Sequence, residues 1–206
     1  MIVCKRFENC SLDNYRAETP EQKRLVETLA DGIKNGFKDN ILIVGSVGTG
    51  KTHLAYSVVN ALEEKRTGYS DPSFRYYSED KVKYCTIKSI IDNIKASWKD
   101  PSASEMWEYC NKPLLIIDEI GVQYGTDSER TELYEVFNRR YEGMLPIIAI
   151  SNHDEAALLK ILGQRIFDRL TGGAKIFTLS GKSYRQGAES ERRSKRHKGY
   201  FEHCRR

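Results

Sequence analysis

The segment GSVGTGKTH, Gly45 to His53, contains the residue types that a protein needs to bind phosphate groups. Glycines let successive backbone N–H groups curve around an anion, and the N-terminus of a following helix favours negative charge. Lys51 is suited to contact the β- and γ-phosphates of a nucleoside triphosphate, and Thr52 to bind the Mg²⁺ ion that bridges them. We therefore predict binding of ATP and Mg²⁺ by Gly45, Ser46, Val47, Gly48, Thr49, Gly50, Lys51, Thr52 and His53.

A flexible glycine-rich turn without a ligand is the alternative for this segment. Such a turn would explain neither the Lys51-Thr52 pair nor its place between the aliphatic run ILIV and the helical run LAYSVVNAL. The pattern GxxxxGK[ST] in that setting favours nucleotide binding. His53 can equally be a solvated residue of the first helical turn.

Two adjacent carboxylates end the apolar run KPLLIIDEIG. Open parallel sheets bind ligands at the carboxyl ends of their strands, so Asp118 is predicted to hold Mg²⁺. Glu119 is suited to orient and deprotonate an attacking water, which predicts hydrolysis of the nucleotide. Acidic residues that merely end a strand are the alternative, and the phosphate-binding segment upstream makes it the weaker one.

A further polar residue, Asn152, follows the apolar run PIIAIS. Its amide is suited to reach the γ-phosphate or the attacking water. Taken alone, an Asn at a strand end is more often a turn residue.

The segment LGQRIFDRL places Arg165 and Arg169 four residues apart, on one face of a predicted helix. Helix periodicity directs Ile166 and Leu170 to the core and allows both arginines to lie on a solvated face with Asp168 as a partner. The alternative is that the guanidinium groups act on another molecule.

Short apolar runs alternate with longer amphipathic runs, a pattern typical of parallel strands joined by helices. The predicted strands are Ile41 to Val44, Tyr84 to Ile87, Leu114 to Ile117, Pro146 to Ser151 and Lys175 to Leu179. The first predicted helix begins at Pro20, with Thr19 as its N-cap, and ends near Asn35-Gly36. The other predicted helices are Lys51 to Lys65, Ser89 to Trp98, Glu129 to Tyr141, Glu155 to Leu162 and Arg165 to Leu170. Residues 68–80 are predicted to form a surface loop.

The 206 residues are enough for one compact domain, and the net charge of +4 is unevenly distributed. Residues 182–206 carry nine Lys or Arg against three Asp or Glu, which exceeds the surplus of the whole chain. The five cysteines have no CxxC spacing and predict reduced thiols. Without a signal peptide or a long apolar run, we expect a cytoplasmic protein that has no membrane partner.

Five segments occur in an order typical of one family: NCSLDNYR, GTGKTHLA, IDEIGVQ, LGQRIFDRL and KSYR. Through them, from Asn9 to Arg185, the chain resembles AAA+ ATPases of the DnaC/IstB-like subgroup, and most closely the DnaC-type helicase loaders. The resemblance implies a P-loop NTPase fold, a three-layer α/β sandwich with a five-stranded parallel sheet and no C-terminal helical lid domain. By the same resemblance Asn152 is the sensor 1 residue and Arg185 the sensor 2 arginine. Arg169 aligns with an arginine finger that acts on a neighbouring subunit, with Arg165 as the alternative, which implies a homo-oligomer.

The resemblance also implies a role in DNA replication, as a loader or regulator of a replicative helicase that binds single-stranded DNA. Loaders of this type grip the helicase through an N-terminal helical domain. Only about eight residues precede the Asn9 match here, so we expect that domain to be missing and helicase contact to be less favoured. We predict an AAA+ domain at residues 1–187, with a lead-in segment at 1–18, and a basic tail at 188–206 that binds DNA or only aids solubility. The alternatives are an IstB-like ATPase that assists a transposase, and a nucleotide-gated DNA-binding module with negligible hydrolysis.

Overall fold

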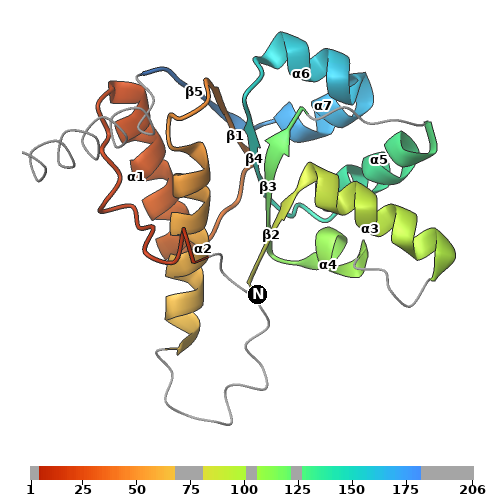
Figure 1. Ribbon diagram of the computed structural model, residues 1–206, viewed down its shortest axis with the longest axis horizontal. Helices are drawn as coiled ribbons and strands as arrows, with labels where there is room; N and C mark the ends of the chain where they lie inside the picture. Colours follow the sequence, from red (N-terminus) through yellow and green to blue (C-terminus); the bar gives the residue numbers. More distant parts are fainter. Residues whose placement is uncertain (1–4, 68–80, 101–105, 122–126, 182–206) are drawn as a thin grey trace, which may run out of the picture.

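The computed structural model describes the protein at residues 5–67, 81–100, 106–121 and 127–181. These residues contain a sheet of five parallel strands in the order β2-β3-β4-β1-β5 (Figure 1). The strands are β1 (Ile41–Gly45), β2 (Val82–Thr86), β3 (Leu114–Ile120), β4 (Ile147–Ser151) and β5 (Lys175–Leu179). The prediction of an α/β fold with a five-stranded parallel sheet is therefore confirmed.

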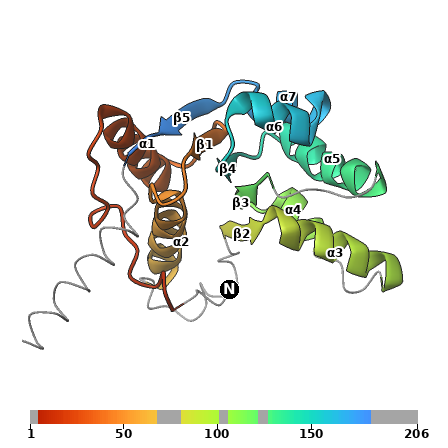
Figure 2. The ribbon, with the colours of Figure 1, turned by 45° about the horizontal axis from the view of Figure 1, so that its top comes forward.

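Helices cover both faces of the sheet and complete a three-layer sandwich (Figures 1 and 2). One face carries α1 (Pro20–Asn35) and α2 (Lys51–Thr67). The other face carries α3 (Ile87–Lys99), α4 (Met106–Asn111), α5 (Asp127–Glu142), α6 (Glu155–Leu162) and α7 (Gln164–Thr171).

The central strand β1 shows how the sequence produces two cores. Its first four residues are all buried, but successive side chains of a strand point to opposite faces. Ile41 and Ile43 pack with the α1 and α2 side, whereas Leu42 and Val44 pack with the side of α3 to α7. A continuous aliphatic run is therefore required, because each face is covered by helices.

The boundary between β2 and α3 differs from the prediction. The strand ends at Thr86 and the helix begins at Ile87, two residues before the predicted start at Ser89. The Thr86 side chain accepts the Ser89 backbone N–H at 3.1 Å, and the Ser89 hydroxyl oxygen accepts the Thr86 N–H at 3.1 Å. This reciprocal capping satisfies two backbone donors and begins the helix immediately after the strand. The β-branched Ile87 therefore belongs to the helix.

Helix α4 was absent from the sequence prediction, and a buried arginine of α5 binds its end. Arg140 is fully buried, and its terminal nitrogens donate to the backbone oxygens of Tyr109, Lys112 and Pro146 at 2.8 to 2.9 Å. Burial lowers the pKa of Arg140 to about 10. The Arg140 side chain thus connects helix α5 both to the end of α4 and to the residue before β4.

We predict that Arg140→Leu lowers the free energy of unfolding by about 3 kcal/mol, because two buried carbonyl oxygens and one part-buried carbonyl oxygen lose their donor. Chemical denaturation with circular dichroism measures the change. The neighbouring Arg139→Ala is the matched control, since Arg139 is exposed and bonds only Glu135 on its own helix surface among the described residues. We expect a change below about 0.5 kcal/mol for that control. Equal effects of the two variants would contradict the structural role of Arg140.

Predictions about the cysteines, membrane helices and terminal segments compare with the structure as follows. Cys10, Cys85 and Cys110 are unpaired thiols, as expected for reduced cysteines. Among the described helices, none is long and apolar enough to cross a membrane. The predicted loop at 68–80, the tail at 188–206 and the predicted absence of a C-terminal lid concern residues outside the described ranges.

Candidate nucleotide-binding site

The segment from Gly45 to His53 joins the carboxyl end of β1 to the first turn of α2. Two of its glycines are required by the packing around them. A Cβ atom on Gly45 would lie 2.1 Å from the Leu179 carbonyl oxygen of β5. Gly50 has φ of +86°, and a Cβ atom there would lie 2.6 Å from the Tyr15 ring. These positions exclude larger residues and keep the loop backbone compact.

Lys51 is buried and its ammonium group lies inside this loop. Its Nζ donates to the carbonyl oxygens of Gly45 at 2.8 Å and Ser46 at 2.7 Å. The Thr49 hydroxyl donates to the same Ser46 oxygen at 3.0 Å. A concentrated positive charge therefore stands at the N-terminus of α2, where a phosphate group is most favoured.

The predicted metal-binding residues Thr52 and Asp118 lie together. The Thr52 hydroxyl donates to Oδ2 of Asp118 at 2.9 Å, although 66 residues separate them in the chain. Asp118 is buried at the end of β3, on the face covered by α2. Mg²⁺ is typically held by one or two protein oxygens, with phosphates and waters completing its shell. A hydroxyl beside one carboxylate fits that need, and the described residues hold no cluster of three His, Cys, Asp or Glu for a protein-only metal site.

Sequence reasoning missed a third partner of this carboxylate, Tyr84 of β2. Its hydroxyl donates to Oδ2 of Asp118 at 3.0 Å. Burial, followed by the negative charge of Asp118, raises the pKa of Tyr84, so the phenol stays protonated and remains a donor. An aromatic residue with a hydroxyl, two positions before the end of the neighbouring strand, was the signal available in the sequence.

Glu119 is exposed and occupies a local irregularity of the sheet. The register between β3 and β4 shifts between Ile117 and Ile120, which is the signature of a β-bulge. Glu119 has φ of +58°, and its backbone N–H donates to Oδ1 of Asp118 at 2.7 Å. The bulge separates the two adjacent carboxylates, because one is buried in the sheet and the other is turned out to solvent. Non-glycine residues adopt such a φ at a cost that is often associated with functional sites.

Asn152 is exposed directly after β4 and lines the same pocket as the loop and the acidic pair. This pocket has a volume of about 390 Å³, within the range of ligand sites. Its lining also includes Val47, Gly48, Gly50, Lys51, Thr52, His53, Asp118 and Glu119. The predicted residues of three strand ends are thus brought to one place, as expected for parallel strands that share an edge.

The lead-in segment supplies two further lining residues that sequence reasoning did not predict, Arg6 and Phe7. The segment is bound to α2 by Asn60, whose amide donates to the carbonyl oxygens of Phe7, Glu8 and Cys10 at 2.8 to 3.2 Å. Residues before the first helix therefore form a wall of the pocket.

His53, predicted to contact the ligand, directs its ring to the lead-in segment. Nε2 lies 3.1 Å from the Ser11 carbonyl oxygen, and Nδ1 lies 3.4 Å from Sγ of Cys10. These contacts hold the segment against α2. A role of His53 toward the nucleotide remains a prediction.

The two arginines of LGQRIFDRL differ in their surroundings. Arg165 is exposed, whereas Arg169 is half-buried and lies against α5. Nε of Arg169 donates to Oδ1 of Asn138 at 3.1 Å, and its guanidinium lies 4.8 Å from the centre of the Tyr141 ring. Asp168, the partner expected on a solvated face, instead accepts a bond from Gln164 at 2.7 Å.

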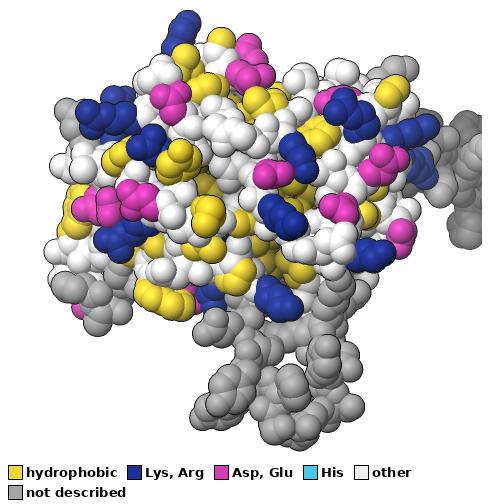
Figure 3. Space-filling model, turned by 180° about the vertical axis from the view of Figure 1, so that it is seen from behind, with side chains coloured by type: hydrophobic (Ala, Val, Ile, Leu, Met, Phe, Trp, Pro, Cys, Tyr) yellow, Lys and Arg dark blue, Asp and Glu magenta, His cyan; other side chains and the backbone are white. Residues whose placement is uncertain are grey.

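Arg185, the predicted sensor 2 residue, lies outside the described residues, as does the basic tail. On the face shown in Figure 3, the described Lys and Arg side chains are interspersed with Asp and Glu. No large patch of one sign is visible among these coloured side chains. The excess of basic residues is a property of the sequence at 182–206.

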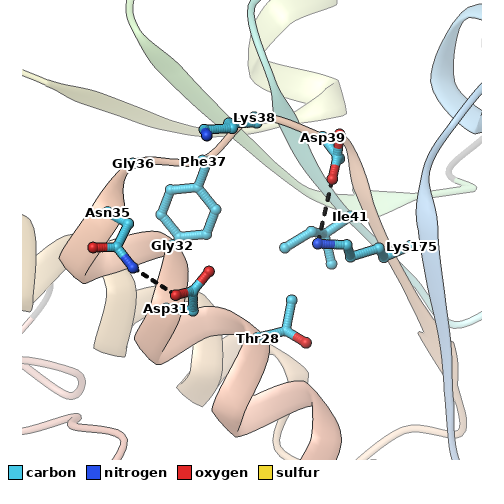
Figure 4. A pocket seen from close by; sticks show the side chains of 10 residues that line it. All are labelled: Thr28, Asp31, Gly32, Asn35, Gly36, Phe37, Lys38, Asp39, Ile41 and Lys175. Atoms are coloured by element: carbon cyan, nitrogen blue, oxygen red, sulfur yellow. Dashed lines mark hydrogen bonds and ion pairs between the residues drawn. The ribbon is translucent and has the colours of Figure 1, made fainter.

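A second hollow, of about 290 Å³, lies at the other end of the sheet, beside the starts of β1 and β5 (Figure 4). The ring of Phe37 covers Gly32, and Lys175 forms an ion pair with Asp39 at 3.3 Å. Asp31 accepts a bond from Asn35 at 2.7 Å. Two pairs of polar groups in this hollow thus bind one another, and its lining contains none of the residues predicted for the nucleotide.

Comparisons with known proteins identify the family to which this chain belongs. A family model described as IstB-like ATP binding protein matches residues 5–192. The replicative helicase loader DnaC of Escherichia coli (strain K12) is 28% identical over 178 residues, which cover 84% of this chain and 67% of that protein.

Solved structures show the same fold. A crystal structure of the DnaC helicase loader matches with a TM-score of 0.71 and 22% identity, covering 86% of this chain and 100% of that one. A structure of the replication initiator DnaA bound to AMPPCP and single-stranded DNA matches with a TM-score of 0.65 and 24% identity, covering 84% and 51% of the respective chains. With the family model matching most of its length, the chain belongs to the IstB-like ATP-binding proteins, and its fold is that of DnaC-like AAA+ proteins.

Proposed function

We propose that this protein hydrolyses ATP with Mg²⁺, assembles with its own copies or a related subunit, and acts on single-stranded DNA during replication. The observation that carries the proposal is the convergence of Lys51, Thr52, Asp118, Glu119 and Asn152 from three strand ends on one pocket. A site that only binds nucleotide needs the first three of these residues. Glu119 and Asn152 are the additional groups expected where a water is activated and positioned.

The chain's own residues divide the work in this proposal. The loop amides and Lys51 bind the phosphates, while Thr52 and Asp118 hold the metal ion, which when bound neutralises charge on the phosphate oxygens. Glu119 accepts a proton from the attacking water, and Asn152 orients that water or the terminal phosphate. The exposed position of Glu119, turned out by the bulge, gives its carboxylate access to a water in the pocket.

The proposal of a replication role draws on relatives whose names state one, including a replicative helicase loader. The DnaA structure was solved with single-stranded DNA, and this chain shares that fold. We propose the AAA+ domain at residues 1–187, and we assign the basic residues of 188–206 to DNA contact, because Lys and Arg neutralise backbone phosphates. Arg185 remains the proposed sensor 2 residue.

The second candidate is an ATPase that assists a transposase. It is favoured by the matching family model, which is described as IstB-like. Affinity capture from the native cell with ATP present distinguishes the two candidates. A retained helicase supports the replication role, whereas a retained transposase supports the second candidate.

We predict that single-stranded DNA stimulates ATP hydrolysis several-fold. The reason is that DNA binding favours the assembled state, in which an arginine of the neighbouring subunit completes each nucleotide site. Phosphate release, measured with and without a poly-dT oligonucleotide, tests this result. In Lys51→Ala, phosphate release should fall to the background both with and without the oligonucleotide, because the β- and γ-phosphates lose the lysine cation. Phosphate release that persists in this variant would indicate a contaminating ATPase, and hydrolysis absent from the unmodified protein would favour a nucleotide-gated binding module.

A further inference from the structure

The carboxylate of Asp118 is held by three donors from three different elements. Oδ2 accepts from the Thr52 hydroxyl of α2 at 2.9 Å and from the Tyr84 hydroxyl of β2 at 3.0 Å. Oδ1 accepts the backbone N–H of Glu119 at 2.7 Å. Each carboxylate oxygen thus accepts at least one hydrogen bond, and these bonds fix the orientation of the carboxylate.

The position of Tyr84 follows from the register of the sheet. In the pairing of β2 with β3, Tyr84 is opposite Ile116 and Thr86 is opposite Asp118. Side chains alternate along a strand, so Tyr84 and Asp118 lie on the same face of the sheet, the face covered by α2. A long side chain one pair away can reach diagonally along that face, and the Tyr84 hydroxyl does so.

Two other aromatic rings fix the direction of Tyr84. Its ring lies 4.5 Å, centre to centre, from that of Tyr56 in the second turn of α2. The Tyr56 ring in turn stacks on Phe7 of the lead-in segment at 4.5 Å with an interplanar angle of 10°. Because Phe7 also lines the nucleotide pocket, this row of rings runs from one pocket wall to the metal-binding carboxylate.

We infer that Tyr84 is a positioning residue for Mg²⁺, which orients the Asp118 carboxylate so that Thr52 and Asp118 bind the ion together. The inference rests on the Mg²⁺ site of the proposed function. Partners that hydrogen-bond to a metal ligand commonly set its orientation, and their loss weakens metal binding. Without the phenol hydroxyl, Thr52 would be the one remaining side-chain donor to Oδ2 among the described residues, and its hydroxyl must also face the ion.

The test is Tyr84→Phe, which keeps the ring against Tyr56 and removes the hydroxyl that faces Asp118 and Tyr56. Binding of a fluorescent ATP analogue is measured as Mg²⁺ is titrated, and again in EDTA. We expect the Mg²⁺ concentration for half-maximal binding to rise about 10-fold, with the affinity in EDTA unchanged. A thermal melt in EDTA shows that the variant is folded.

Ser97→Ala is the control, because it removes a hydroxyl that donates to the Ile94 carbonyl oxygen within α3 at 2.7 Å and does not line the pocket. Its Mg²⁺ midpoint should equal that of the unmodified protein. An unshifted midpoint in Tyr84→Phe would overturn the inference, and so would an equal loss of affinity with Mg²⁺ and in EDTA. Failure of the proposed hydrolysis would look different, since phosphate release would be absent while Mg²⁺-dependent binding remained.

Discussion

Replacing Glu119 by glutamine is expected to lower the rate of ATP hydrolysis by about 100-fold or more, while the affinity for ATP is retained. The physical reason is that glutamine cannot accept the proton of the attacking water, a role typically worth this factor or more. Glutamine keeps the size of the side chain and its exposed position after the bulge. Single-turnover hydrolysis, with nucleotide binding measured separately, distinguishes loss of chemistry from loss of binding.

Glu27→Gln serves as the control for this prediction. Glu27 is an exposed carboxylate on α1 that does not line the pocket, so its loss should leave both measurements unchanged. If Glu119→Gln hydrolyses ATP at the normal rate, the assignment of the base is wrong. If binding falls as much as hydrolysis, Glu119 supports the bulge or the metal site instead of the water.

The second large effect is expected at Arg169, where alanine should lower hydrolysis by about 1000-fold in the assembled protein. In the structure, Asn138 binds Nε of Arg169 and the Tyr141 ring lies against one face of its guanidinium. The terminal nitrogens make no hydrogen bond to the described residues and are suited to a bidentate phosphate contact. A fixed guanidinium loses little conformational freedom when a phosphate arrives.

Mixing two inactive variants tests whether Arg169 acts between subunits. Arg169→Ala keeps an intact pocket, whereas Lys51→Ala keeps an intact Arg169, so a mixed interface can pair one with the other. In an equal mixture, about a quarter of head-to-tail interfaces have the productive order, and hydrolysis should recover accordingly. A mixture that stays inactive would contradict action between subunits.

Arg165→Ala is the companion variant, because Arg165 is exposed on the same helix and is the alternative finger. We expect it to hydrolyse ATP more rapidly than Arg169→Ala. The reverse order, with recovery only in mixtures that contain Arg165→Ala, would assign the finger to Arg165.

The elements that bind phosphate could be predicted because their requirements are local. A glycine loop between an aliphatic strand and a helix, with Lys51 and Thr52, specifies its own conformation within nine residues. The aliphatic runs predicted the parallel sheet, because only strands covered on both faces are apolar at every position. The ends of those strands then predicted the shared position of Asp118, Glu119 and Asn152.

Other features could not be predicted, because they depend on contacts between distant segments. The start of α3 was wrong by two residues, since the capping pair of Thr86 and Ser89 prevailed over the β-propensity of Ile87. Helix α4 is held in part by Arg140 from α5, a contact that local pattern does not contain.

By itself, the sequence determined the phosphate loop, the parallel sheet and the strand ends that carry the acidic pair, because these follow from residue type and spacing along a few turns or strands. Only the tertiary structure decided which side chains complete the site. It placed Tyr84 on the carboxylate of Asp118, turned Glu119 outward through a one-residue bulge, and brought Phe7 to the pocket wall. These three placements depend on strand register or on packing between segments far apart in the chain. The local conformational preference of a residue does not determine either.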